Sequence, residues 1–179
     1  QLAPGSRGSG IKFQSKVVGG KVPRDYVPAV EKGVRKAAAE GVIAGYEVVD
    51  VDVTLVDGSS HSVDSSSMAF EIAGSMGFRQ GMKDASPQLL EPVLAIQVTA
   101  PESSAGDVIS DLNGRRARIL NVDSANGVTF KIDAQVPAAS MQRYSAELRS
   151  LTQAQGDFMA SFAHYDPVPP DYNVGGSSG

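Results

Sequence analysis

Residues 93–136 read VLAIQVTAPESSAGDVISDLNGRRARILNVDSANGVTFKIDAQV and contain the clearest pattern of alternating strands and helices in the chain. Three segments of this stretch have the apolar pattern of β-strands: Val93–Thr99, Ala117–Val122 and Val128–Val136. Between the first two, apolar residues recur at helical spacing and predict a helix at Ala105–Asn113. The dipeptide Asn126-Gly127 is a strong hairpin signal, so the second and third strands are expected to be neighbours.

The residues that follow complete the pattern. A helical stripe comes first, made of Met141, Tyr144, Leu148 and Leu151, and a strand is predicted at Phe158–Tyr165. The order is therefore β-α-β-β-α-β in under about 80 residues, which is the ferredoxin-like arrangement. We expect this domain to span residues 92–167, followed by a flexible tail at 168–179 that is rich in Pro, Gly and Ser.

Residues 1–91, on the N-terminal side of this domain, have a second α+β pattern. Residues 1–10 are poor in apolar side chains, so no structure is expected there. Elements are then predicted as a strand at Ile11–Val17, a helix from Asp25 to Gly41, and a strand from Tyr46 to Asp57-Gly58. A further helix carries an apolar stripe of Met68, Ala69, Ile72, Ala73 and Met76. Its glycines, Gly74, Gly77 and Gly81, suggest that another element packs closely there.

The composition limits the classes of function. The 179 residues include no cysteine, which excludes disulfides and thiolate metal sites. No apolar run approaches the ~20 residues that a membrane helix needs, so we expect a cytoplasmic location and no membrane partner. We also expect a monomer. The net charge of −4 offers no overall attraction to nucleic acid, so any RNA contact has to be local.

Catalytic and cofactor motifs are not matched. The only Gly-Lys pair, Gly20-Lys21, lacks the first Gly and the Ser or Thr of a nucleotide-binding loop. The two histidines, His61 and His164, fall in separate predicted domains, and His164 shares a strand face with aromatic residues that suggests an edge-of-core position. We therefore expect no catalytic residue, no metal site and no cofactor in this chain.

Two groups of residues could instead bind a partner. His61 sits in a polar loop between a strand and a helix, where it is either a recognition residue or an ordinary solvated histidine. Arg115, Arg116 and Arg118 follow a predicted helix, where they either complement the helix dipole or contact a phosphate backbone.

Five long segments resemble the C-terminal part of bacterial elongation factor G: GGKVPRDYVPAVEKGVRKA (19–37), GVIAGYEVVDVDVTLVDGSSHSVDSSSMAFEIAGSMGF (41–78), LLEPVLAIQVTAPE (89–102), GDVISDLNGRRARI (106–119) and YSAELRSLTQAQGDF (144–158). The resemblance runs from about Ile11 to Pro167. It implies domains IV and V of that factor: a βα domain like domain 2 of ribosomal protein S5, with a left-handed crossover, and then a ferredoxin-like domain. GTP and Mg²⁺ would belong to an N-terminal domain that this chain does not contain.

The same resemblance assigns site residues and partners. The family's tip histidine falls on His61, so the tip loop, defined here as Gly58, Ser59, Ser60, His61 and Ser62, is expected to enter the decoding site of the small ribosomal subunit beside the tRNA–mRNA complex. The family's arginine pair falls on Arg115 and Arg116, and with Arg118 these are expected to bind RNA of the large subunit. The expected partner is the ribosome, through rRNA and ribosomal proteins, and the expected process is translocation.

Alternatives stay open at this point. Ser60 replaces the family's usual Tyr beside the tip histidine, and Ser67 replaces a Glu, so a paralogue devoted to ribosome recycling or to tetracycline-type ribosome protection is the first alternative. A regulatory small-molecule-binding module is the second, because ferredoxin-like domains also serve that role. An enzyme using His61 with Asp64 as an acid–base pair is the third.

Overall fold

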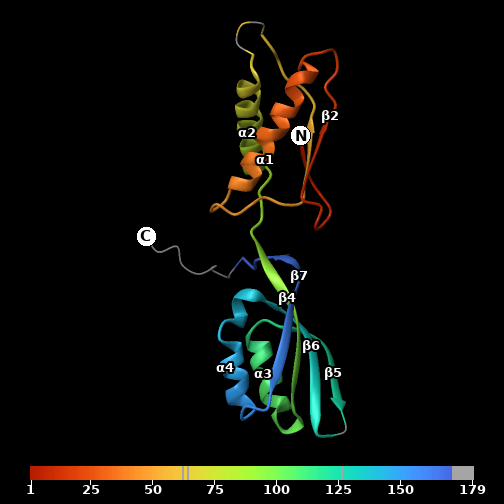
Figure 1. Cartoon of the computed structure of the whole chain (residues 1–179), viewed down its shortest axis with the longest axis vertical. Helices are drawn as coiled ribbons and strands as arrows, with labels where there is room; N and C mark the ends of the chain where they lie inside the picture. Colours follow the sequence, from red (N-terminus) through yellow and green to blue (C-terminus); the bar gives the residue numbers. More distant parts are fainter. Residues whose placement is uncertain (62, 64, 126, 171–179) are drawn as a thin grey trace, which may run out of the picture. The chain divides into compact units, whose positions relative to one another are not determined.

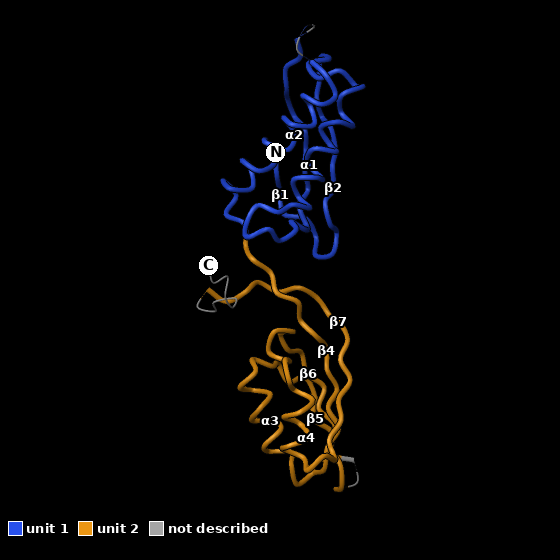
Figure 2. The backbone as a smooth tube through the Cα atoms, turned by 60° about the vertical axis from the view of Figure 1, so that its left-hand side comes forward, with its two compact units in different colours: residues 1–87 blue, residues 88–179 orange. Residues whose placement is uncertain are grey.

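Two separate sheets organise the part of the chain that the structure describes, one of three strands and one of four. The structure is a computed structural model and describes residues 1–61, 63, 65–125 and 127–170. The sheets belong to two compact units, Gln1–Pro87 and Gln88–Gly179 (Figure 2). Each unit has its own core of buried apolar residues.

The first unit places two helices on a short sheet. Its strands are β1 (Leu2–Pro4), β2 (Ile11–Ser15) and β3 (Val51–Leu55), and its helices are α1 (Val27–Glu40) and α2 (Ser67–Asp84). The central strand is β3, which pairs antiparallel with β1 and parallel with β2. The helices α1 and α2 pack side by side (Figure 1). Because β2 and β3 are parallel neighbours, the loops that follow them leave from the same edge of the sheet.

Alternating residues of β3 and one face of each helix form the main core of this unit. Its buried members are Val34, Ala37, Ala38, Val51, Val53, Phe78 and Met82. A smaller cluster of buried residues consists of Val22, Val30 and Phe70, with Tyr26 and Leu55 among the partly buried residues packed against it. We call this smaller group the distal cluster.

Glycines allow the two helices to approach closely. A Cβ added at Gly33 of α1 would lie 1.9 Å from the Glu71 carbonyl oxygen, and one added at Gly74 of α2 would lie 2.6 Å from the Val30 carbonyl oxygen. The expected close approach is therefore confirmed at Gly74. It is also confirmed at Gly81, which faces Leu2, but it is wrong at Gly77, where nothing lies within 4 Å.

The apolar stripe that predicts α2 is not its buried face. Met68, Ile72 and Met76 are 73%, 52% and 65% exposed. The buried residues of the helix are instead Phe70, Phe78 and Met82. The side of α2 that carries Gly74 turns toward α1, and this packing leaves the methionine stripe in contact with solvent.

Two strand predictions in this unit need correction. Residues 1–10 do carry structure, because Leu2–Pro4 forms β1 and the Gln1 amino group donates to the Thr54 carbonyl oxygen at 2.8 Å. The strand expected from Tyr46 begins only at Val51. Asp50 has a left-handed φ of 60°, and its carboxylate accepts from the Gly10 amide at 3.0 Å, so the chain turns there before it joins the sheet.

The second unit has the ferredoxin-like order. Its elements are β4 (Leu90–Pro101), α3 (Ala105–Gly114), β5 (Arg118–Ala125), β6 (Thr129–Pro137), α4 (Tyr144–Leu151) and β7 (Asp157–Pro167). The sheet runs β5-β6-β4-β7 and every pair is antiparallel. The helices α3 and α4 lie on the same face of this sheet (Figure 1). The predicted α+β class and the ferredoxin-like arrangement are confirmed, while the predicted turn residue Asn126 lies outside the described residues.

The start of β4 shows where the second unit begins. The units divide between Pro87 and Gln88, so the predicted boundary after Glu91 falls inside a strand. Glu91 and Pro92 pair with Asp166 and Tyr165 of β7, which makes them part of the sheet although Pro92 contributes no N–H. Of the predicted tail, residues 168–170 are described, and the Val168 amide donates to the Leu89 carbonyl oxygen at 3.0 Å.

Candidate nucleic-acid interface

The tip loop connects β3 to α2 in the first unit. Gly58, Ser59, Ser60 and His61 are all exposed, as the polar sequence predicts, and Ser62 lies outside the described residues. The His61 amide donates to the Ser65 hydroxyl at 2.8 Å, and the Ser65 amide donates to the His61 carbonyl oxygen at 3.0 Å. These two bonds hold the backbone of His61 and leave its imidazole exposed to a partner.

An ion pair stands at the base of the tip loop. Lys21 Nζ lies 3.0 Å from Asp57 Oδ1, and the Gly58 amide donates to the same carboxylate at 2.9 Å. The Lys21 hydrogen bond, followed by the Gly58 bond, lowers the pKa of Asp57, so this carboxylate stays charged at neutral pH. Lys21 is thus engaged with Asp57 and the next residue, Val22, is buried, which does not fit the phosphate-binding loop of a nucleotide site.

The three arginines of the second unit have different surroundings. Arg115 is only 12% exposed in its side chain, and its guanidinium donates to Asp111 at 2.7 Å and to the Ser140 carbonyl oxygen at 2.5 Å. It also pairs with Glu147 of α4 and lies over the Tyr144 ring, 4.9 Å from its centre. Arg115 therefore ties α3 to α4, and the expectation that it presents its charge to RNA is not supported by its position.

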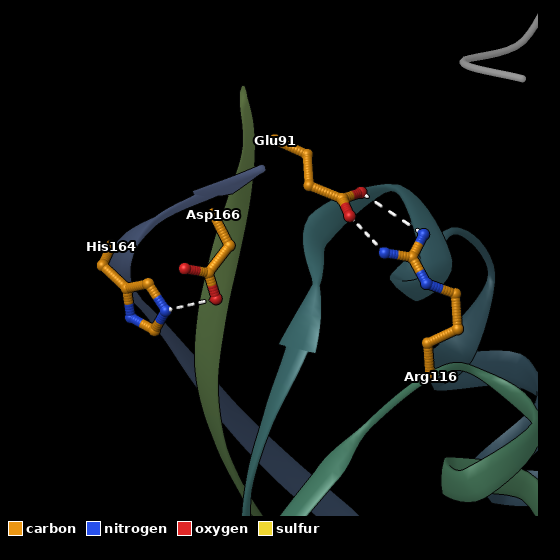
Figure 3. A network of polar contacts seen from close by, with 4 residues as sticks. All are labelled: Glu91, Arg116, His164 and Asp166. Atoms are coloured by element: carbon orange, nitrogen blue, oxygen red, sulfur yellow. Dashed lines mark hydrogen bonds and ion pairs between the residues drawn. The ribbon is translucent and has the colours of Figure 1, made fainter. Parts of the chain in front are cut away.

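Arg116 forms an ion pair of its own while part of its side chain stays exposed. It adopts a left-handed φ of 64° in the turn before β5, and its guanidinium binds Glu91 at the start of β4 (Figure 3). Glu91 is 8% exposed, whereas the Arg116 side chain is 30% exposed. Burying the Glu91 carboxylate would be costly without a paired charge, and Arg116 supplies that charge. The ion pair fixes the turn before β5 to the sheet, while part of the Arg116 guanidinium stays at the surface.

Arg118, the first residue of β5, is the exposed member of the group. The Asp111 partner of Arg115 could be foreseen from the i,i+4 spacing on a helix. The Glu91 partner of Arg116 could not, because 25 residues separate the two and only the sheet brings them together.

The second histidine of the chain lies far along the sequence from the tip loop, in the second unit. His164 on β7 is half-buried, and its Nε2 lies 2.9 Å from Asp166 (Figure 3). Asp64, the suggested acid–base partner of His61, lies outside the described residues. Among the residues that are described, no group of three or more His, Asp or Glu could hold a metal ion, and no helix is both long and apolar enough to span a membrane.

Comparisons with known proteins agree with this division into units. The family model described as "Elongation factor G, domain IV" matches residues 1–86, and that described as "Elongation factor G C-terminus" matches residues 88–174.

Individual relatives agree with the family models. Elongation factor G of Granulibacter bethesdensis is 51% identical over 93% of this chain, which spans 24% of that protein. A crystal structure of a protein from Thermus thermophilus matches with a TM-score of 0.84 and 40% identity, over 94% of this chain and 25% of that one. The two family models and the Granulibacter bethesdensis relative all belong to elongation factor G. This chain is therefore a member of the elongation factor G family and carries its domain IV and its C-terminal domain.

Proposed function

We propose that this chain is the ribosome-binding part of a longer translational GTPase that promotes movement of the tRNA–mRNA complex in the cytoplasm. The observation that carries the proposal is the exposure of Gly58, Ser59, Ser60 and His61 in the tip loop, on a unit that matches domain IV of elongation factor G. The chain spans about a quarter of the relative's length, so GTP binding and hydrolysis would reside in the remaining part. The contribution of this chain is recognition of RNA.

The role of the tip loop follows from its chemistry. The loop presents hydroxyls and one imidazole, groups that can donate and accept hydrogen bonds from bases, phosphates and 2′-hydroxyls. With a net charge of −4, the chain has little long-range attraction to RNA. Shape and short-range contacts at this loop would then provide the recognition.

The experiment is a chimera in which this chain replaces the matching segment of the Granulibacter bethesdensis factor. We expect the chimera to support translocation, and His61→Ala to slow translocation by roughly tenfold, equivalent to about 1.4 kcal/mol, with GTP turnover unchanged. Equal translocation rates for the two proteins would overturn the proposed role of His61. A chimera that splits ribosomes or removes tetracycline without translocating would instead support the recycling or protection alternative.

For the second unit, Arg118 is the arginine we propose as a contact to phosphates of large-subunit rRNA, with the exposed part of Arg116 beside it. Arg118→Ala in the chimera should reduce the salt dependence of ribosome binding by roughly one phosphate contact. Lys131→Ala, which removes an exposed lysine from β6, is the matched control for charge. The same salt dependence in both variants and the parent would exclude the Arg118 contact.

A further inference from the structure

Two residues that flank the tip loop, Asp57 before it and Ser65 after it, both contact one segment of the chain, Lys21–Tyr26, which we call the brace segment. It belongs to the connection that leaves β2, whereas the tip loop leaves β3. Because the last residues of these strands pair in register, Ser15 with Leu55, the two connections start next to each other. The brace segment is therefore close enough to contact Gly58, the first residue of the tip loop, and Ser65 beyond the loop.

At the start of the tip loop, an ion pair and close packing restrain the chain. Lys21 pairs with Asp57, and Val22 packs against Gly58 so closely that a Cβ added there would lie 2.5 Å from Val22 Cγ2. Val22 is 5% exposed and belongs to the distal cluster. A valine has little freedom to rotate away, so position 58 has no room for a side chain while Val22 stays in place.

Beyond the tip loop, Tyr26 contacts Ser65 and Phe70. Its hydroxyl donates to the Ser65 carbonyl oxygen at 3.4 Å, and its ring stacks on Phe70 with centres 4.7 Å apart and planes at 16°. Phe70 is a buried residue near the start of α2. Since Ser65 exchanges two hydrogen bonds with His61, a restraint on Ser65 is passed directly to the backbone of the tip histidine.

We propose that Lys21, Val22 and Tyr26 are positioning residues that hold Gly58 and the backbone of His61 in the conformation that binds RNA. The inference rests on the proposed function, and it adds residues that do not touch the RNA themselves. A group whose backbone is already held in place loses less conformational entropy when it binds, so these restraints raise affinity without adding a contact. The RNA-binding surface thus depends on two connections of the sheet rather than on one loop.

The shape restraint can be tested by a double-mutant cycle. Gly58→Ala should collide with Val22, raise the mobility of the His61 amide in ¹⁵N relaxation of the full chain, and weaken ribosome binding of the chimera by about three- to tenfold. Val22→Ala removes the colliding methyl groups, so the double variant Gly58→Ala/Val22→Ala should bind better than the product of the two single effects. Affinities that multiply without coupling would overturn the Val22 restraint.

The charge restraint has a matched control in the same connection. Lys16 is exposed and takes part in no side-chain ion pair among the described residues, so Lys16→Met removes a charge without removing the brace. Lys21→Met should weaken binding several times more than Lys16→Met, and the exchange of charges in Lys21→Asp/Asp57→Lys should restore part of the loss. Equal losses for the two lysines would mean that Lys21 contributes charge only, and would overturn its positioning role.

Tyr26→Phe separates the inference from the proposed function. It keeps the stacked ring and removes the bond to Ser65, so the His61 amide should become more mobile while the fold stays intact. Unchanged mobility would overturn the brace whatever the chain binds. Greater mobility of the His61 amide in Tyr26→Phe with unchanged affinity has two readings, which His61→Ala separates. If His61→Ala weakens ribosome binding, the positioning role of Tyr26 is overturned. If His61→Ala leaves ribosome binding unchanged, the proposed function of the tip loop is overturned.

Discussion

At the scale of single residues, Arg115 shows how a charged side chain can be structural. Its guanidinium meets Asp111, the Ser140 carbonyl oxygen and Glu147 while only 12% of the side chain is exposed. We expect Arg115→Ala to lower the unfolding free energy by about 1–3 kcal/mol, because it leaves these acceptors unpaired. Arg118→Ala should change it by less than about 0.5 kcal/mol. Urea unfolding of both variants checks this, and equal effects would contradict the assigned roles.

Tyr144 provides a prediction about alkaline pH. Burial, with the nearby Asp111 charge as a second cause, raises the pKa of Tyr144 to about 12 from 10.0. The unfolded chain then loses this proton at a lower pH than the folded one, so the unfolding free energy should decline as the pH rises from about 10 to 12.

Tyr144→Phe is the matched variant, because the Tyr144 hydroxyl is buried without a hydrogen-bond partner in the described structure. The variant should be at least as stable as the parent at neutral pH and should lose less stability between pH 10 and 12. Thermal unfolding across this range measures both quantities. Parallel pH profiles for the two proteins would show that Tyr144 does not ionise on unfolding as described.

The exposure of His61 could be predicted from the sequence because its neighbours are small and polar. The surroundings of the arginines could not, because a run of basic residues after a helix looks the same whether its carboxylate partners are near or absent. Glu91 reaches Arg116 only across the sheet. Likewise, no local signal links Lys21 to Asp57, which are joined by the parallel pairing of β2 and β3.

At the scale of elements, the contact between α1 and α2 depends on glycine. Gly33→Ala places a Cβ 1.9 Å from a backbone oxygen of α2, so the helices have to separate. We expect a loss of about 1–3 kcal/mol or more in unfolding free energy. Gly77→Ala is the control in α2: nothing lies within 4 Å of the added carbon, and the better helix propensity should stabilise the chain by about 0.5–1 kcal/mol. Destabilisation of the same size by both changes would contradict this packing.

The helices and most strands were predictable because their apolar periodicity is long and regular. The errors concern short or turning segments. β1 is only three residues long. The alternating apolar pattern runs from Tyr46 to Leu55, but the left-handed Asp50 interrupts the extended backbone, so the strand begins only at Val51. The face of α2 was ambiguous for a different reason: apolar residues occur all around it, and the glycines decide which side meets α1.

At the scale of the whole molecule, we propose that the two units fold independently. The buried residues of the second unit include Val98, Val108, Leu112, Ile132 and Leu148, all from that unit. A chain of residues 88–170 should therefore show the mixed helix and strand signal in far-UV circular dichroism and unfold in one cooperative urea transition. An unfolded 88–170 chain beside a stable 179-residue chain would show that the second unit needs the first.

Whether the tip loop reaches the decoding site can be measured directly, because this chain contains no cysteine. A single cysteine introduced as Ser59→Cys, an exposed position that leaves His61 in place, can carry a tethered iron–EDTA group that cleaves RNA near that position when ribosomes are added. Ser103→Cys, in an exposed turn of the second unit, is the control position. We expect cleavage of small-subunit rRNA at the decoding site from position 59 and none there from position 103. Decoding-site cleavage that is absent from position 59, or equal from the two positions, would mean that the tip loop does not reach this site.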